Sequence, residues 1–129
     1  MLHALTDVPS HPVLSGRGKD NYSSQYMTRN RVRKWLEPSY TIVATRRSNP
    51  QHPDVTMVKD ASTGQWVFGA LGSKRLSAIE CARIQTFPDT FNWEGVSLDA
   101  AYRMIGNAVP VNLARALAEH IKEQLQTVR

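Results

Sequence analysis

The stretch "RLSAIECARIQTFPD", residues 75–89, carries the clearest structural signal in the sequence. Ser77 stands three residues before Glu80, which is the spacing of a capping box at the start of a helix. In that arrangement the serine hydroxyl accepts from the N–H of residue 80, and the glutamate carboxylate accepts from the N–H of residue 77. Pro88 cannot continue a helix. The stretch therefore predicts a short helix that begins after Ser77 and ends at Pro88.

Two more helices are predicted toward the C-terminus, on either side of "IGNAVP", residues 105–110. Ser97 is suited to cap the first of them, which we expect to run to Ile105. Gly106 suits the left-handed position that closes many helices. The next helix is expected to begin at or beside Pro110, where the missing N–H costs nothing. The segment is thus interpreted as a helix–loop–helix junction.

The last helix has one apolar face, because leucine or isoleucine recurs at every fourth position. These four residues, here called the apolar stripe, are Leu113, Leu117, Ile121 and Leu125. Soluble monomers rarely leave a large apolar surface in water. Three arrangements remain open: the stripe folds back on the helices of 77–105, pairs with a second copy, or meets a separate large subunit. For the isolated chain we expect self-association as a homodimer.

The preceding part of the chain is poorer in helical signals. Residues 1–20 are rich in Pro, Ser, Gly and His, and they predict a tail or linker. Residues 39–45, "SYTIVAT", predict a strand, and a hairpin is predicted to turn near Gly64. Together these signals predict an α+β fold. A small mixed β region with loops and a hairpin, 21–75, is expected to precede a helical segment, 76–129.

Composition limits the class of protein. The 129 residues suffice for one domain. No apolar run approaches the roughly 18 residues that cross a membrane, and the N-terminus lacks a basic start followed by an apolar stretch. We therefore expect no membrane association and no secretory signal. A single cysteine, Cys81, excludes an internal disulfide and favours the reducing cytoplasm.

Positive charge is concentrated in one third of the chain. Residues 16–47 contain eight of the sixteen lysines and arginines and only two acidic residues, whereas residues 48–129 contain eight of each sign. Residues 16–47 therefore carry a net charge of +6, against +5 for the whole chain, as is typical of a surface that binds a polyanion such as nucleic acid. A solvated basic loop is the alternative that composition leaves open.

The sequence offers no reaction centre of its own. Cys81 lies inside the first predicted helix with no histidine near it in sequence, which favours a small buried residue over a nucleophile. The four histidines are scattered, without the spacing of metal ligands. We predict no catalytic residue and no metal site within these residues.

Two long motifs resemble those of the cytosine-5 DNA methyltransferases. The first is similar to the ninth motif of that family, matched at Arg75, Leu76, Ser77, Glu80, Arg83, Gln85, Phe87 and Pro88. The second, "GNAVP" at 106–110, is similar to the tenth and last motif. Residues 26–53 are similar to the target-recognition region of bacterial methylases of the HaeIII type, which modify the inner cytosine of GGCC. The resemblance covers roughly residues 21–125.

This resemblance implies double-stranded DNA as a partner, with GGCC in the target, and assigns residues 21–75 to target recognition. It also implies that Asn107 and Ala108 lie beside S-adenosylmethionine and that the last helix packs on a large catalytic domain. The family's Phe-x-Gly-x-Gly, Pro-Cys and Glu-Asn-Val motifs are missing from the 129 residues. The expectation is an incomplete methyltransferase without the Rossmann-like catalytic core.

Such a chain is expected to be the small subunit of a split bacterial enzyme or a truncated form of one. It binds the cofactor only together with a catalytic subunit and is inactive alone. A stand-alone DNA-binding or interaction protein, or a decayed remnant with no methylation role, is the alternative. The adjacent coding sequence would distinguish these readings.

The basic side chains of the recognition region are candidates for DNA contacts. The guanidinium group matches O6 and N7 of guanine in the major groove, and we predict base contacts from Arg29, Arg31 and Arg47. Phosphate contacts are the alternative for these three. Phosphate contacts are also predicted for a second group, which comprises Arg33, Lys34 and Arg46. Within the adjacent pair, either Arg46 or Arg47 could be the base reader.

Overall fold

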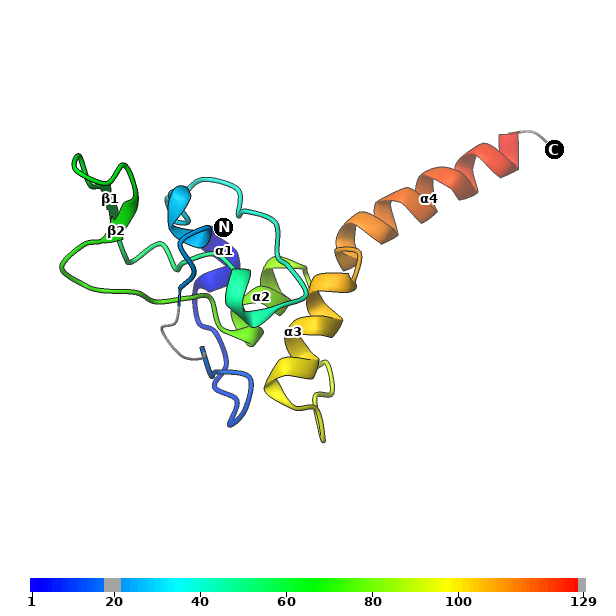
Figure 1. Ribbon diagram of the computed structural model, residues 1–129. Helices are drawn as coiled ribbons and strands as arrows, with labels where there is room; N and C mark the ends of the chain where they lie inside the picture. Colours follow the sequence, from blue (N-terminus) through cyan, green and yellow to red (C-terminus); the bar gives the residue numbers. More distant parts are fainter. Residues whose placement is uncertain (18–21, 128–129) are drawn as a thin grey trace.

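The computed structural model describes residues 1–17 and 22–127, and among them it has the predicted α+β fold (Figure 1). A loop-rich part with a two-stranded sheet precedes three helices. The elements are α1 (Leu2–Leu5), the 3-10 turns η1 (Tyr26–Thr28) and η2 (Arg46–Ser48), β1 (Met57–Lys59), β2 (Trp66–Phe68), α2 (Ala78–Ile84), α3 (Leu98–Asn107) and α4 (Val111–Thr127). No helix in this part of the chain is long and apolar enough to cross a membrane.

The predicted hairpin is confirmed. β1 pairs antiparallel with β2 in a register that places Val58 opposite Val67. Gly64 provides the positive φ of +70° that the turn requires. The hairpin packs against the rest of the chain at Phe68, whose ring centroid lies 4.8 Å from that of Tyr22.

The predicted strand at 39–45 is wrong. The segment is extended but pairs with no strand among the described residues. The Asn49 side chain instead accepts from the N–H of Val43 at 3.1 Å and donates to the carbonyls of Val43 and Thr45 at 3.2 and 3.0 Å. An asparagine side chain can thus take the backbone hydrogen bonds that a neighbouring strand would make. The segment places Ile42 in the core.

The N-terminal segment is more than the expected tail or linker, as far as the structure describes it. Leu5 and Leu14 are 8% and 0% exposed and belong to the hydrophobic core. The carbonyl of Leu14 accepts from the backbone N–H of Ile79, at the start of α2, at 3.2 Å. Residues 1–17 therefore pack as part of the fold, and 18–20 lie outside the described residues.

α2 is the centre of the core and begins as predicted. The Ser77 hydroxyl accepts from the N–H of Glu80 at 3.3 Å, and the Glu80 carboxylate accepts from the N–H of Ser77 at 2.7 Å. Residues 78–82 are all buried. α3 packs beside α2, and its Tyr102 hydroxyl donates to the carbonyl of Leu76 at 2.8 Å.

The sequence predicted that this helix ends at Pro88. α2 ends four residues earlier, at Ile84. Thr86 adopts the left-handed conformation, with φ of +60°. The N–H of Phe87 then donates back to the carbonyl of Ala82 at 2.9 Å. This is the hydrogen bond of a Schellman motif, with threonine at the position that glycine usually occupies.

α3 begins as predicted but ends later. Ser97 caps it by accepting from the N–H of Ala100 at 3.3 Å. The helix continues to Asn107, so Gly106 is helical and the predicted left-handed conformation is wrong. A Cβ at Gly106 would lie 2.5 Å from the Cα of Ala44 and closer still to its nitrogen. Glycine is needed here for the close approach of two backbone segments, not for a turn.

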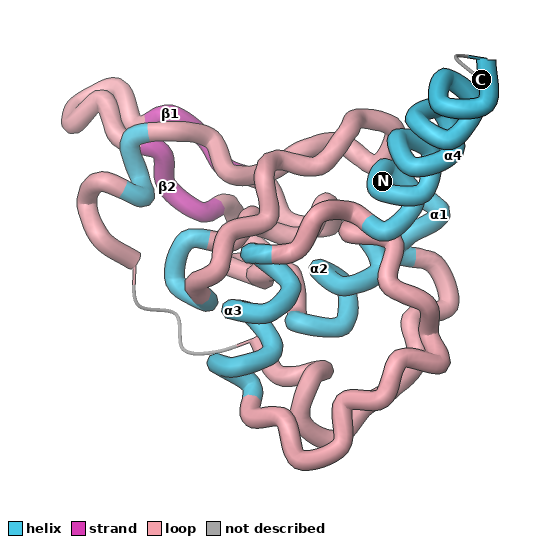
Figure 2. Tube along the Cα trace, turned by 90° about the vertical axis from the view of Figure 1, so that its right-hand side faces the viewer, coloured by secondary structure: helices cyan, strands magenta, loops and turns pink. Residues whose placement is uncertain are grey.

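α4 begins beside Pro110, as predicted, and is attached to the end of α2. The N–H of Val111 donates to the carbonyl of Gln85 at 3.1 Å, and that of Asn112 donates to the hydroxyl of Thr86 at 2.9 Å. Figures 1 and 2 show α4 projecting from the other elements, and none of its residues is buried. The apolar stripe, 51–64% exposed, does not fold back on α2 and α3.

Candidate nucleic-acid interface

The two 3-10 turns, η1 and η2, carry or flank the candidate arginines and are joined by Tyr26. Tyr26 is 5% exposed, and its hydroxyl donates to the carbonyl of Asn49 at 2.8 Å. The Nε2 of Gln51 donates to the same hydroxyl oxygen at 3.1 Å. Burial raises the pKa of Tyr26 above its usual value, so the hydroxyl remains protonated. Tyr26 therefore links the segment before Arg29 to the segment after Arg47.

Arg31 is held in a defined orientation by Tyr26. Its Nε donates to the carbonyl of Tyr26 at 3.1 Å, and its guanidinium carbon lies 4.8 Å from the centre of the Tyr26 ring. Both contacts restrict the planar guanidinium group. The hydrogen bond uses Nε, and the two terminal nitrogens have no hydrogen bond or ion pair with the residues that the structure describes. This is the geometry that a bidentate contact requires.

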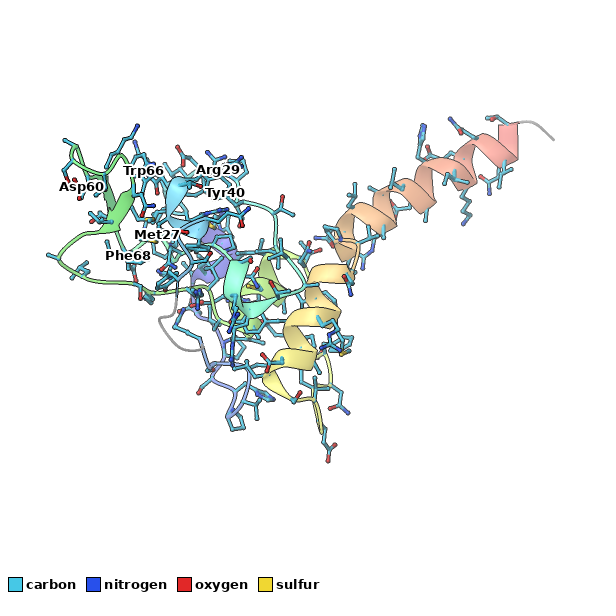
Figure 3. The ribbon with its side chains drawn as sticks, in the orientation of Figure 1. Met27, Arg29, Tyr40, Asp60, Trp66 and Phe68 are labelled. Carbon is cyan, nitrogen blue, oxygen red and sulfur yellow. The ribbon has the colours of Figure 1, made fainter. Side chains whose placement is uncertain are left out.

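The other basic residues near η1 differ in exposure. Arg29 and Lys34 are exposed. Arg33 is half-buried, with its guanidinium carbon 4.0 Å from the centre of the Tyr40 ring. Its buried Nε has no hydrogen-bond partner among the described residues. Figure 3 shows Arg29 and Tyr40 at the end of the molecule that carries the hairpin, away from α4.

Arg46 and Arg47 are adjacent in sequence but have different surroundings. The Nε of Arg46 lies 3.6 Å from the Asp99 carboxylate on α3. Arg47 is exposed and lines a recess together with Ser23, Tyr26 and Ser48. The structure thus brings Arg47, and not its neighbour, next to the tyrosine that holds Arg31.

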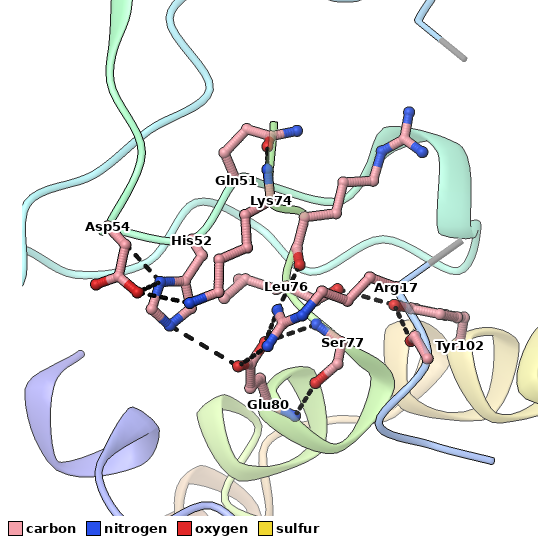
Figure 4. Close-up of polar contacts among 11 residues, drawn as sticks. Arg17, Gln51, His52, Asp54, Lys74, Leu76, Ser77, Glu80 and Tyr102 are labelled. Carbon is pink, nitrogen blue, oxygen red and sulfur yellow. Dashed lines mark hydrogen bonds and ion pairs between the residues drawn. The ribbon is translucent and has the colours of Figure 1, made fainter. Parts of the chain in front are cut away.

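A polar cluster surrounds the buried Glu80 at the start of α2 (Figure 4). Arg17 donates to both carboxylate oxygens of Glu80, at 2.6 and 2.7 Å, and to the carbonyl of Arg75 at 2.7 Å. The Nε2 of His52 lies 3.8 Å from a Glu80 carboxylate oxygen. The sequence identified Glu80 only as a helix cap. No local pattern indicates its pairing with Arg17, which is 63 positions away.

The protonation states of this cluster follow from its contacts. Burial alone would raise the pKa of Glu80, but hydrogen bonds from Arg17 and from the N–H of Ser77 outweigh burial and lower it. Glu80 is therefore ionised at neutral pH. Burial lowers the pKa of His52 below 6.5, although the Glu80 charge opposes this. His52 is therefore neutral at neutral pH, and its contact with Glu80 is not an ion pair.

The two candidate cofactor residues lie at the junction of α3 and α4. Asn107 is exposed at the last position of α3, and the N–H of Ala108 donates to the carbonyl of Ile105 at 3.2 Å. Gln85, at the end of α2, donates to the same carbonyl at 3.3 Å. The exposed amide of Asn107 can both donate and accept, which fits one polar wall of a ligand site.

Cys81 packs as a small core residue. It is fully buried in α2, and burial raises the pKa of its thiol far above the usual value. A thiol without access to substrate and without a stabilised thiolate cannot attack a base.

Comparisons with known proteins point to DNA methylases. The family model described as "C-5 cytosine-specific DNA methylase" matches residues 6–123. The chain is 46% identical over 121 residues to type II methyltransferase M.FnuDI of Fusobacterium nucleatum, covering 92% of this chain and 34% of that protein. It is 43% identical over 125 residues to M.MthTI of Methanothermobacter thermautotrophicus, covering 95% of this chain and 37% of that protein. The chain thus spans about a third of the length of these curated relatives.

Proposed function

Because the chain belongs to the C-5 cytosine-specific DNA methylase family, we propose that it supplies the DNA target-recognition part of a restriction-modification methyltransferase. Members of this family are methyltransferases that use S-adenosylmethionine. In this proposal the chain is a small subunit that acts in the cytoplasm with a large catalytic subunit. That subunit carries the cysteine nucleophile and most of the cofactor site, which Asn107 and Ala108 complete. Without it we expect no methyl transfer.

The observation that carries the proposal is the fixed guanidinium of Arg31 within the most basic third of the chain. An arginine whose orientation is set before binding loses little freedom when it pairs with guanine O6 and N7. We assign base contacts in a GGCC-containing duplex to Arg29, Arg31 and Arg47. Phosphate contacts are assigned to the remaining candidates, which are Arg33, Lys34 and Arg46.

Replacing Arg31 with alanine is expected to weaken binding to a GGCC duplex about 5- to 150-fold, as befits one lost bidentate base contact. Binding to a duplex of the same composition in scrambled order should weaken much less. Affinities for both duplexes, measured by fluorescence anisotropy at two salt concentrations, provide the test.

Lys34→Ala is the matched control, because Lys34 is an exposed cation three residues away. Its loss should weaken both duplexes alike and reduce the dependence of affinity on salt. Equal losses on both duplexes for Arg31→Ala would reduce Arg31 to a phosphate contact. A wild-type chain that binds neither duplex would contradict the proposed function.

The apolar stripe is proposed as the surface that meets the catalytic subunit. The stripe is about half exposed along all of α4, and the chain covers only a third of the length of its relatives. The catalytic part, which makes up the remaining two thirds of such an enzyme, is the partner that we propose covers this apolar surface. In the isolated chain the occupant is a second copy.

The stripe is expected to drive self-association of the purified chain. Sedimentation of the wild type should show dimers or larger species, whereas Leu117→Glu combined with Ile121→Glu should be monomeric. Because both positions are exposed, the double variant should remain folded, and its melting temperature should fall only by what association adds to the wild type. Arg115→Glu, on the opposite face of α4, changes the net charge by the same amount and should associate like the wild type. A monomeric wild type whose double variant unfolds would show that the stripe is internal core.

A further inference from the structure

We propose that Asn49 is a positioning residue for target recognition, which closes residues 43–49 into a fixed loop and thereby places Arg47 beside Tyr26. This inference rests on the proposed function, in which Arg47 contacts a base. The loop contains η2, and no strand pairing supports it among the described residues. Within the loop the N–H of Ser48 donates to the carbonyl of Thr45 at 3.3 Å, and the rest of its conformation depends on contacts with other parts of the chain and on the Asn49 side chain.

The Asn49 side chain joins the two ends of the loop. It is fully buried, and it accepts from the N–H of Val43 and donates to the carbonyls of Val43 and Thr45 at 3.0–3.2 Å. Both amide hydrogens and the amide oxygen are thus used. A side chain that lacks the amide would leave these half-buried backbone groups without their partner.

The main chain of Asn49 fixes the loop to η1. Its carbonyl accepts from the Tyr26 hydroxyl at 2.8 Å, and Tyr26 in turn holds the guanidinium of Arg31 by its carbonyl and its ring. Arg47 lines the recess beside the same tyrosine. The buried hydrogen bond from Tyr26 to Asn49 therefore connects two of the three arginines proposed to read bases: Arg31, which Tyr26 holds directly, and Arg47, whose loop ends at Asn49.

The opposite side of the loop is fixed to α3. The Ala44 backbone lies against Gly106, and the Arg46 guanidinium lies 3.6 Å from the Asp99 carboxylate. With these contacts in place, Arg47 is the exposed arginine of the pair. A loop that is ordered before binding loses less conformational entropy on binding than a mobile loop. The gain in affinity is largest for DNA whose bases Arg47 contacts.

The test is a double-mutant cycle on the full 129-residue chain with Arg47→Ala, Asn49→Ala and the double variant. Affinities are measured for a GGCC duplex and for its scrambled counterpart, after a melting curve has verified that each variant folds. Asn49→Ala is expected to weaken GGCC binding about tenfold and scrambled binding less than about twofold. In the Arg47→Ala background the same substitution should have little further effect on GGCC binding.

Two further variants make the test independent of simple destabilisation. Asn92→Ala removes an asparagine that accepts from the N–H of Glu94 at 2.9 Å in an exposed turn remote in sequence from the loop, and should leave the preference for GGCC unchanged. Asn49→Ser keeps a hydrogen-bonding group and should retain part of the preference. It replaces Asn49→Ala in the cycle if the alanine variant does not fold.

The outcomes separate this inference from the proposed function. If the wild type shows no preference for GGCC, the proposed function fails and the inference with it. If the preference depends on Arg47 but is unchanged in the Asn49 variants, the inference alone fails. Losses at Asn49 that are equal on both duplexes, or additive with Arg47→Ala, would assign Asn49 to stability only and would also overturn it.

Discussion

Replacing Gly106 with alanine is expected to destabilise the fold by about 3 kcal/mol or more, or to displace the 43–49 loop from α3. At an unobstructed helical position the same change would stabilise by about 1 kcal/mol, because alanine is the better helix former. Here the new methyl group would overlap the backbone of Val43 and Ala44. Overpacking commonly costs about 1–3 kcal/mol, and a clash with backbone is at the upper end because no rotamer change relieves it. Thermal and urea denaturation measure the effect.

Gly64→Ala is the control for this substitution. Its φ is +70° and a Cβ there would contact nothing, so only the left-handed conformation is penalised, by about 1–2 kcal/mol. The loss at Gly106 should exceed it. The Gly106 variant should also lose the preference for GGCC if it folds, because the loop that carries Arg47 rests on this glycine. A Gly106→Ala chain as stable as the wild type would contradict the close approach of α3 to the loop.

Replacing Glu80 with glutamine is expected to cost about 3 kcal/mol, the lower end of the range for breaking a buried ion pair. The change removes the negative charge of the carboxylate, whose two oxygens accept from the Arg17 guanidinium at 2.6 and 2.7 Å. Glu80 is nearly fully buried, while a third of the Arg17 side chain is exposed, so water partly compensates the remaining guanidinium. Glu123→Gln in exposed α4 is the control and should change stability by less than about 0.5 kcal/mol.

The same cluster predicts how stability depends on pH. The pKa values of Glu80 and His52 are both lowered by folding, so both groups stabilise the native state above their unfolded pKa values. The free energy of unfolding should therefore fall as the pH drops below about 6.5 and then below about 4.5. In Glu80→Gln the second decrease should be smaller. Urea unfolding of both chains between pH 7 and pH 3 measures the difference, and parallel curves below about pH 4.5 would contradict the assignment.

The features that the sequence predicted correctly are local ones. The capping box at Ser77 and Glu80, the cap at Ser97 and the start beside Pro110 each depend on residues within one helical turn. The hairpin near Gly64 depends on a short turn between two β-prone segments. In the two capped helices the hydrogen-bond partners are three positions apart, and in the hairpin the paired strands follow one another, so the pattern contains the whole interaction.

The features that the sequence did not predict depend on contacts between distant residues. Residues 39–45 have β-branched side chains, but Asn49 takes their backbone hydrogen bonds, so no strand forms. Gly106 looked like the end of a helix, and only the approach of Ala44 explains it. Leu14 is a core residue because it packs with the residues of α2. This contact could not be predicted without knowing where α2 lies. Local propensity cannot anticipate such tertiary contacts.

The candidate site was predicted as a set of residues and not as an arrangement. Charge concentration and resemblance both drew attention to Arg31 and Arg47. The sequence did not indicate that Tyr26 holds one arginine and contacts the loop of the other. It favoured Arg47 as the base reader but left Arg46 open as the alternative, and the nearby Asp99 carboxylate now distinguishes their surroundings.

The attachment of α4 has a consequence for how the helix behaves before assembly. Tertiary hydrogen bonds reach its first turn, from Gln85 and Thr86, and none of its 17 residues is buried. Isolated helices near this length are only marginally stable in water. The distal turns of α4 are therefore expected to fray and to exchange with coil, while the first turn remains ordered. Docking of the apolar stripe would then complete the helix as it binds, so that assembly and the last step of folding become one coupled event.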